Sequence, residues 1–393
     1  MRKLRVALVH DYIKEYGGAE RVLEALCDLY PDAPIYTAFY VKGSLCWERF
    51  KGRDIRSSWV HYVPFFASKL HSPLRFLAPL IWGSFDLSKY DVVISSASWY
   101  VTKGFGRRGT NKKKPVEVCY CHTPPRWLYG YHTSVDWQKF WPVRLYGMIV
   151  GHFMRMYDFR QAQKVDYFVA NSEEVKRRIE KFYRRDARVI YPPVGLGARV
   201  DARGKKQPAS SAGRKSRDYY LVVSRIVGAK GIEMAVEAAR RYGFRLKIAG
   251  ARVGYYKGLE GQVPESVEFL GHVSDEELVE LYGGAKAFLA LATDEDFGIT
   301  PVEAMLCGTP VIAFRGGGYL ETVVEGNPSA GSGPTGVFFD EASAESLGKA
   351  IRKFEGMKFD AKDCVRQANK FSMARFKREI SEFVNLYARI TRS

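Results

Sequence analysis

The stretch that decides the fold is the apolar run AFLALAT (287–293) followed by EDFGITPVE (295–303). The apolar run predicts a buried strand. Thr300 with Glu303 three residues later predicts a capping box that opens a helix, with Pro301 at its first position. Glu295 and Glu303 are therefore expected at the carboxyl end of a strand, beside a helix N-terminus, where open α/β sheets bind ligands. The alternative is structural: Glu303 only caps its helix, and Glu295 is a solvated loop acid.

Length and composition indicate a two-domain globular protein. A chain of 393 residues exceeds what one compact core usually holds. Hydrophobic residues make up 46% and charged residues 26%, and no run approaches the roughly 20 apolar residues of a membrane-spanning helix. The first residues, MRKLRVALVHDY, lead into a strand without the pattern of a signal peptide. The six cysteines show no disulfide or zinc spacing, so we expect a reducing, cytoplasmic setting.

Positive charge is concentrated in the first half. Residues 1–200 contain 33 Lys and Arg against 18 Asp and Glu, whereas residues 201–393 contain 28 against 25. Such a balance favours an anionic partner. No nucleic-acid recognition motif accompanies the basic runs, so nucleic acid is not expected. Residues 59–85 mix aromatic and basic side chains, which is typical of a segment at a membrane surface, although these aromatics could equally fill the core of the first domain.

Strand-like and helix-like runs alternate along the chain, which predicts parallel sheets with crossover helices. In the first half we expect strands at 4–10, 35–39, 92–95, 116–120, 167–170 and 188–191, and helices at 19–30 and 173–183, the second capped by Asn171. The polar, basic residues 198–217 predict a flexible loop. The pattern then restarts with strands at 219–223, 245–249, 267–270 and 311–314. Helices are expected at 232–241 and 372–390, and Ser274 with Glu277 predicts a capping box that opens another.

The string EDFGITPVEAMLCGTPVIA (295–313) resembles the signature of the retaining family 4 glycosyltransferases. That pattern has Glu, seven residues, Glu, then Ala-x-x-x-Gly-x-Pro-Val-Ile. The resemblance implies the GT-B fold, which consists of two doubly wound Rossmann-like α/β domains facing across a cleft. It implies an N-terminal acceptor domain at 1–195, a basic linker at 196–217, a nucleotide-sugar domain at 218–371, and a final helix at 372–393 crossing back to the first domain.

The resemblance also implies residues that bind the donor. Arg225 and Lys230 in SRIVGAKG would hold the diphosphate, since arginine grips phosphate in bidentate fashion and lysine supplies a point charge. Gly17 and Gly18 would let the backbone approach the diphosphate at the start of a helix. His122, in CHTPP, would face the donor sugar and phosphate, although a structural histidine is the usual alternative.

Within the central motif, the resemblance assigns Glu295 to the hydroxyls of the transferred sugar and Glu303 to the ribose. Backbone amides around Phe297, Gly298, Ile299 and Thr300 would face sugar and phosphate, and Val273 would lie near the base. We expect front-face displacement, in which the departing phosphate oxygen takes the acceptor proton. Two cations would already face the phosphates, so we expect neither a metal nor another cofactor.

The sequence thus predicts a hexosyltransferase that moves a sugar, with GDP-mannose as the first choice, to a lipid-linked or polysaccharide acceptor. We expect it on the inner face of the cell membrane, held by its basic first domain. Two other functions stay open: a nucleotide-sugar 2-epimerase on the same fold, and a non-catalytic nucleotide-sugar-binding protein at a membrane surface.

Overall fold

The computed structural model describes residues 4–108, 114–133, 140–195, 218–225, 230–250, 263–326 and 333–390. The chain divides into two compact units. Unit 1 comprises Met1–Tyr131, Trp137–Pro193 and Met373–Ser393, and unit 2 comprises His132–Asp136 and Val194–Ser372. The loop expected at 198–217 lies outside the described residues.

Unit 1 is built on a sheet whose described strands follow the order β3-β2-β1-β4-β5-β6-β7, with every pairing parallel. The order reverses between β1 and β4, so the carboxyl ends of these two strands form the topological switch point at which doubly wound sheets bind ligands. The strands are β1 Val6–His10, β2 Ile35–Thr37, β3 Ile55–Ser57, β4 Val92–Ala97, β5 Val116–Cys121, β6 Tyr167–Ala170 and β7 Ala187–Val189.

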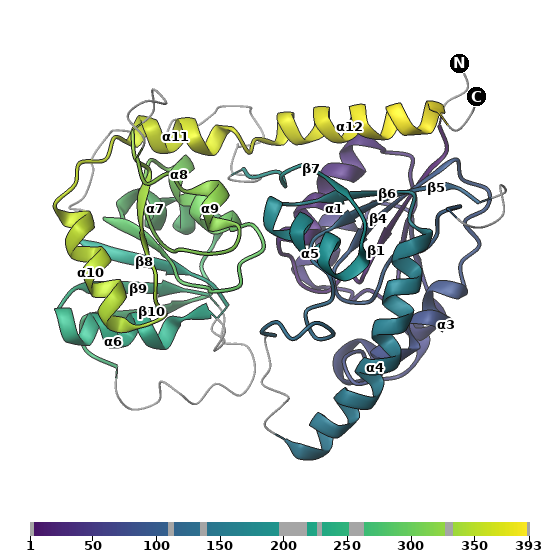
Figure 1. The fold of residues 1–393 in the computed structure, drawn as a ribbon, viewed down its shortest axis with the longest axis horizontal. Coiled ribbons are helices and arrows are strands. Elements are labelled where there is room, and N and C mark those ends of the chain that lie inside the picture. The colour runs from purple at the N-terminus through teal and green to yellow at the C-terminus, as the bar shows by residue number, and fades with distance from the viewer. Residues whose placement is uncertain are drawn as a thin grey trace. The chain divides into compact units, whose positions relative to one another are not determined.

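Helices cover both faces of this sheet (Figure 1). On one face α1 and α12 pack against alternate strand residues such as Leu8, and on the other face Val9 packs with Phe66 and Trp82. The helices are α1 Gly18–Leu29, α2 Leu45–Phe50, α3 Ala78–Gly83, α4 Trp141–Lys164, α5 Glu173–Tyr183 and α12 Met373–Ile390, with single turns at Trp59–Tyr62, Phe66–Leu70 and Arg75–Leu77.

Unit 2 repeats the plan with a sheet of order β10-β9-β8-β11-β12-β13, again parallel throughout its described strands. Its switch point lies between β8 and β11. The strands are β8 Tyr219–Val223, β9 Arg245–Ala249, β10 Val267–Gly271, β11 Ala287–Ala290, β12 Val311–Phe314 and β13 Gly336–Phe339. The helices are α6 Ile232–Tyr242, α7 Asp275–Gly284, α8 Ile299–Leu306, α9 Tyr319–Thr322, α10 Ala344–Glu355 and α11 Ala361–Asn369.

Two of the expected helix caps were wrong. The helix after the central motif begins at Ile299, two residues earlier than the Pro301 start that we expected, because Gly298 adopts a positive φ of 89° and serves as the N-cap. Pro301 therefore occupies the third helical position, where its missing N–H is one of those left without a helical partner. Helix α5 is capped by Ser172, whose side chain accepts from the Val175 amide at 3.0 Å, and not by Asn171.

The capping box at Ser274 is confirmed. Its hydroxyl accepts from the amide of Glu277 at 3.2 Å, and the Glu277 carboxylate accepts from the amide of Ser274 at 2.7 Å. Within the described residues, no helix has the length and apolar character to cross a membrane.

Candidate functional site

One polar contact of unit 2 joins two residues that the family resemblance assigned to the donor. Lys230 Nζ lies 2.8 Å from Glu295 Oε2, and both side chains are partly exposed. Lys230 precedes α6 and Glu295 follows β11, so both residues lie beside the switch point of this sheet. An ammonium and a carboxylate held together there present one group suited to phosphate and one suited to sugar hydroxyls.

Gly231 explains why the two segments meet. It adopts a φ of +70°, and a Cβ at this position would lie 2.9 Å from Leu291 Cβ and 3.0 Å from Leu291 O. Only a glycine lets this turn sit against the residue that follows β11 without displacing it. Lys230, the neighbour of Gly231, is thereby brought over the loop that carries Glu295.

The loop carrying Glu295 is held by glycines that follow β12. The amide of Gly318 donates to the carbonyl of Glu295 at 3.0 Å. A Cβ at Gly317, where φ is +55°, would lie 2.2 Å from that carbonyl, and one at Gly318 would lie 2.3 Å from Phe297 Cα. Sequence reasoning missed these glycines, although the run GGG at 316–318 was the available signal.

Glu303 lies inside unit 2, only 1% exposed. Its Oε2 accepts a hydrogen bond from the Tyr282 hydroxyl of α7 at 3.0 Å. The reciprocal-cap alternative for Glu303 does not hold, since the helix begins at Ile299 and its N-cap is a glycine. A buried carboxylate that accepts hydrogen bonds is a ready acceptor for ligand hydroxyls as well, but Tyr282 already uses part of its capacity.

The other residues expected at the donor lie around the same sheet edge. Arg225 is exposed just beyond β8, and Val273 is half-buried between β10 and α7. Phe297 is buried and packs edge-on against Phe371, with ring centroids 5.2 Å apart, so its side chain belongs to the core. Ile299 and Thr300 form the first turn of α8, whose free amides favour anions. Residues 226–229 of the SRIVGAKG segment lie outside the described residues.

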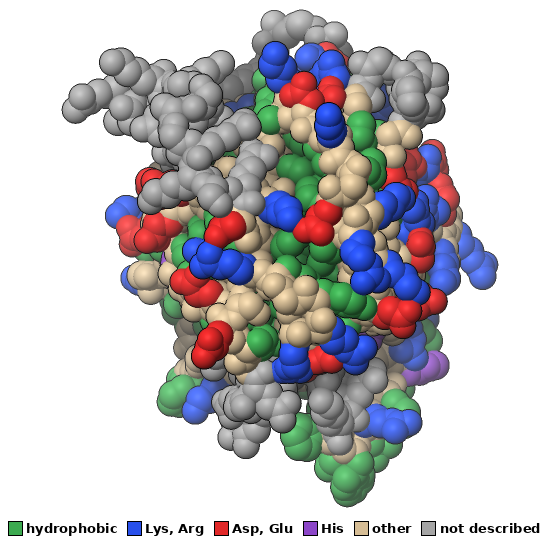
Figure 2. Space-filling model, turned by 90° about the vertical axis from the view of Figure 1, so that its left-hand side faces the viewer, with side chains coloured by type: hydrophobic (Ala, Val, Ile, Leu, Met, Phe, Trp, Pro, Cys, Tyr) green, Lys and Arg blue, Asp and Glu red, His purple; other side chains and the backbone are tan. Residues whose placement is uncertain are grey.

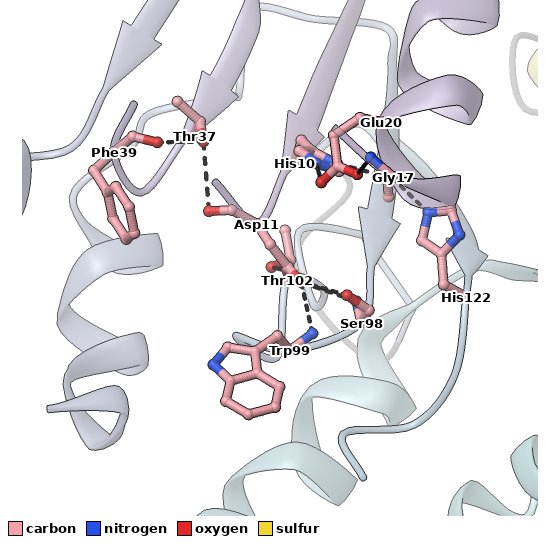
Figure 3. Close-up of polar contacts among 11 residues, drawn as sticks. His10, Asp11, Gly17, Glu20, Thr37, Phe39, Ser98, Trp99, Thr102 and His122 are labelled. Carbon is pink, nitrogen blue, oxygen red and sulfur yellow. Dashed lines mark hydrogen bonds and ion pairs between the residues drawn. The ribbon is translucent and has the colours of Figure 1, made fainter. Parts of the chain in front are cut away.

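In unit 1, His122 belongs to a chain of buried polar contacts. His122 Nε2 lies 2.8 Å from Ser96 Oγ, and the same oxygen lies 3.0 Å from His10 Nδ1. His10 Nε2 is 3.4 Å from Glu20 Oε1, and the other carboxylate oxygen of Glu20 accepts from the Gly17 amide at 2.8 Å. Figure 3 shows His10, Gly17, Glu20 and His122 gathered where β1 and α1 meet. The chain therefore links both sequence-assigned elements of this unit, the glycine turn and His122.

Strand register creates this chain. His10 and Ser96 are directly paired residues of neighbouring parallel strands β1 and β4, at the switch point of the sheet. Burial, with a smaller contribution from His10, lowers the pKa of His122 to about 3. His122 is therefore neutral at physiological pH and offers one donor and one acceptor nitrogen. Sequence reasoning missed Ser96 and Glu20.

A second buried carboxylate holds the loop beside this chain. Asp11 accepts from the Ser98 amide at 3.2 Å, from the Ser98 hydroxyl at 2.8 Å and from the Trp99 amide at 2.6 Å, as well as from the Thr102 hydroxyl (Figure 3). Four donors satisfy one buried carboxylate, so the segment after β4 is fixed to the residue after β1. Asp11 is thus a structural partner of the switch point, and the sequence signalled it only by its place directly after a strand.

Comparison with known proteins agrees with this architecture. The family described as "Glycosyltransferase Family 4" matches residues 16–197, and "Glycosyl transferases group 1" matches residues 205–371. The chain belongs to the family 4 (group 1) glycosyltransferases. The two matches fall on the two halves of this glycosyltransferase, one over unit 1 and one over unit 2.

Curated relatives of this glycosyltransferase include mannosyltransferases. It is 27% identical over 232 residues to the alpha-1,3/1,6-mannosyltransferase ALG2 of Mus musculus, a match that covers 53% of this chain and 55% of the mouse protein. The chain thus spans about half the length of that relative. It is 26% identical over 381 residues to ALG2 of Kluyveromyces lactis, covering 82% and 72%. It is also 29% identical over 180 residues to the D-inositol 3-phosphate glycosyltransferase of Mycolicibacterium smegmatis, covering 42% and 41%.

Solved structures share the fold of this glycosyltransferase. HepE of Anabaena, in complex with UDP and glucose, superposes with a TM-score of 0.67 at 17% identity, covering 98% of this chain and 100% of HepE. Sucrose-phosphate synthase from Thermosynechococcus elongatus gives a TM-score of 0.68 at 19% identity, covering 98% and 100%. These superpositions cover nearly the whole chain and confirm the GT-B fold that the family resemblance implied.

Proposed function

We propose that this protein is a retaining hexosyltransferase that uses a nucleotide-diphosphate sugar and delivers the sugar to a lipid-linked or polysaccharide acceptor. The observation that carries the proposal is the contact between Lys230 and Glu295 at the switch point of unit 2. A cation there would face the diphosphate, and an acid beside it would accept from the hydroxyls of the sugar. Arg225, exposed at the end of the neighbouring strand β8, would supply the second positive charge.

The chemistry follows from where charge develops. When the bond between the sugar and the diphosphate breaks, the leaving oxygen gains negative charge, which Lys230 and Arg225 stabilise more in the transition state than in the ground state. The sugar gains oxocarbenium character, and the carboxylate of Glu295 orients it through its hydroxyls. The leaving oxygen takes the proton of the acceptor hydroxyl, so retention needs no protein base.

GDP-mannose is the proposed donor. The ALG2 relatives named as mannosyltransferases support mannose, whereas the HepE complexes with UDP and with UDP-glucose favour a uridine donor. Both donors present the same diphosphate to Lys230 and Arg225. Discrimination between the two donors therefore depends on contacts to the base and to the sugar. We place the reaction at the inner face of the cell membrane, because a lipid-linked acceptor and the excess of positive charge in residues 1–200 both suit an anionic surface.

A donor panel without acceptor tests the proposal. The protein is incubated with GDP-mannose, UDP-glucose and UDP-N-acetylglucosamine, and free sugar and free nucleotide diphosphate are quantified over hours. Slow hydrolysis of one donor, with release of equal amounts of sugar and nucleotide, is the expected result, because a working transferase site leaks to water.

Two other outcomes would favour the two alternative functions. Conversion of a donor to its epimer, with no nucleotide released, would establish the 2-epimerase and overturn the transferase. Binding of a donor without turnover, even when glycolipid extracts are supplied as acceptors, would establish the non-catalytic protein.

A further inference from the structure

Exposed apolar side chains of this protein are concentrated in two segments. Among the described residues, fifteen of the nineteen large hydrophobic side chains that remain exposed lie within 59–80 or 140–159 of unit 1. Soluble proteins expose single hydrophobic residues routinely, but a concentrated patch marks an interaction site. We call these two segments together the apolar ridge.

Helix α4 forms most of the ridge. Its buried side is the stripe Gly151, Met154, Asp158 and Ala162. A second apolar stripe with a spacing of four residues, Trp141, Leu145, Ile149 and Phe153, lies on the opposite side of the helix, where each member is at least 47% exposed. The helix is thus apolar on two sides, one of which packs in unit 1 while the other faces solvent. A helix at the surface of a globular protein normally has one apolar stripe, which faces the core, so a second and exposed apolar stripe indicates an interaction site.

The C-terminal half of α4 is firmly anchored. Asp158 forms a fully buried ion pair with Lys103 and accepts from the Tyr129 hydroxyl at 2.7 Å. Arg185 caps the helix end, donating to the carbonyls of Ala162 at 2.9 Å and Val165 at 2.8 Å. The N-terminal half extends beyond the sheet of unit 1 (Figure 1). The ridge is therefore a projection on a rigid base.

The second segment adjoins α4. The Tyr146 hydroxyl donates to the carbonyl of Pro73, and Val150 packs in the same cluster as Leu70 and Leu74. Phe66 and Trp82 of the aromatic stretch fill the core, whereas Trp59, Tyr62, Phe65 and Phe76 are exposed. The interpretation of these aromatics as core is thus confirmed for Phe66 and Trp82, and contact with a membrane stays a prediction for the exposed ones. In Figure 2 hydrophobic side chains gather at the bottom of the view, at the height at which Figure 1 draws the start of α4.

The charged residues of the two segments indicate which kind of partner binds the apolar ridge. Residues 55–85 and 140–157 contain no Asp or Glu. The exposed cations Lys69, Arg144 and Arg155 belong to the same two segments. Exposed aromatic and aliphatic side chains in segments that contain lysine and arginine but, over these ranges, no carboxylate match the boundary between acyl chains and anionic headgroups. We propose that the apolar ridge inserts into the headgroup region of an anionic lipid bilayer and that the outer stripe of α4 is its main anchor. The inference specifies the membrane attachment included in the proposed function.

Vesicle sedimentation with matched charge substitutions tests this inference. Ile149→Glu places a carboxylate on the outer stripe, and Leu386→Glu places one on α12, outside the ridge; both side chains are 54% exposed in helices of unit 1. The full-length proteins are mixed with phosphatidylcholine vesicles with or without phosphatidylglycerol. The wild type should bind best with phosphatidylglycerol, Ile149→Glu should bind about tenfold or more weakly, and Leu386→Glu should bind like the wild type.

Measurements of Tm, donor hydrolysis and oligomeric state distinguish loss of membrane binding from misfolding and from dimerisation. The Tm and the donor hydrolysis of both variants should equal those of the wild type, which shows that neither variant is misfolded. Binding of Ile149→Glu at wild-type strength would overturn the ridge as the anchor while leaving membrane attachment intact. No binding by the wild type would overturn the attachment itself, and hydrolysis would report independently on the transferase. A wild-type dimer that Ile149→Glu converts to a monomer, with vesicle binding unchanged, would assign the ridge to a second copy of this chain instead.

Discussion

Lys230 Nζ and Glu295 Oε2 lie 2.8 Å apart at the switch point of unit 2, so the proposed phosphate ligand is paired with the proposed sugar ligand before any donor arrives. Both groups are partly exposed, and such a pair contributes at most about 1 kcal/mol. A diphosphate can therefore draw Lys230 away from Glu295 at little cost. Substitution of Glu295 and substitution of Lys230 should therefore change the affinity for GDP in opposite directions.

Glu295→Gln should raise the affinity for GDP up to about fivefold, because Lys230 loses its competing carboxylate. The same variant should lose about 100-fold or more in kcat/KM, because the sugar loses a charged acceptor. Lys230→Met should weaken GDP binding. Calorimetric titration with GDP and steady-state kinetics measure both effects. If Glu295→Gln and Lys230→Met weakened GDP binding equally, the assignment of Glu295 to the sugar would be wrong.

Glu303→Gln tests the assignment of the buried carboxylate to the ribose. Either the 2′- or the 3′-deoxy form of GDP lacks the hydroxyl that Glu303 contacts. The wild type should bind GDP at least about tenfold more tightly than that form, because a hydrogen bond to a charged group contributes about 1.5–3 kcal/mol. The variant should largely lose this discrimination in competition titrations.

Tyr282→Phe is the matched control, because it removes the hydroxyl that donates to Glu303 and leaves the carboxylate in place. It should lower the free energy of unfolding by about 1–3 kcal/mol while preserving discrimination between GDP and deoxy-GDP. Undiminished discrimination by Glu303→Gln would exclude contact with the ribose.

Ser96→Ala should impair turnover by removing the oxygen between His10 and His122. The orientation of His122 then loses its support, and we expect kcat to fall about tenfold with little change in donor affinity. Ser95→Ala is the control on the same strand, since the Ser95 hydroxyl donates to Glu117 at 2.7 Å on the other face of the sheet. It should lower stability and spare kcat. If both variants lost the same fraction of kcat, the loss would reflect disturbed packing of the strand and not the support of His122 by Ser96.

Acid should destabilise the protein through His122. Burial and the nearby His10 lower its pKa from 6.5 to about 3, so the unfolded chain takes up a proton that the folded chain refuses. Stability is therefore complete above pH 6.5 and falls as the pH drops toward 3. At pH 5 the loss from this group is about 2 kcal/mol. Urea unfolding at pH 7.5 and 5 measures it.

His122→Gln should remove that part of the pH dependence. His71, whose pKa burial lowers to about 4, adds a similar contribution that His71→Gln should remove separately. A slope unchanged in His122→Gln would show that this histidine is protonated or solvated in the folded protein. Because His122 stays neutral, its titration should also leave no step in the rate between pH 6 and 9.

Chelation should leave turnover intact. We propose that Arg225 and Lys230 neutralise the diphosphate, a task that other enzymes give to a divalent cation. Donor hydrolysis with an excess of EDTA should therefore equal hydrolysis with added Mg²⁺ or Mn²⁺. Loss of activity on chelation, with recovery on adding a metal, would contradict the proposed role of the two cations.

Local sequence patterns predicted most of the elements and their class. Strands β6, β8, β9 and β12 and helix α5 have the expected bounds, because apolar runs and helical periodicity are local signals. Helix α4 was not predicted, since a helix with apolar residues on two sides shows no clear period. The caps at Gly298 and Ser172 were missed because residues nearby carried equally good capping side chains, and backbone conformation chose between them.

The sequence by itself determined that two parallel α/β halves exist, that the family motif runs from Glu295 through Glu303, and that unit 1 is rich in positive charge. Only the tertiary structure decided which side chains meet. The contact of Lys230 with Glu295 depends on β8 lying beside β11, and that of His10 with Ser96 depends on β1 lying beside β4. Strand order is set by the packing of whole crossover units, which no local pattern encodes. Burial likewise separated the core aromatics from the exposed ridge, because exposure belongs to the assembled unit and not to the residue type.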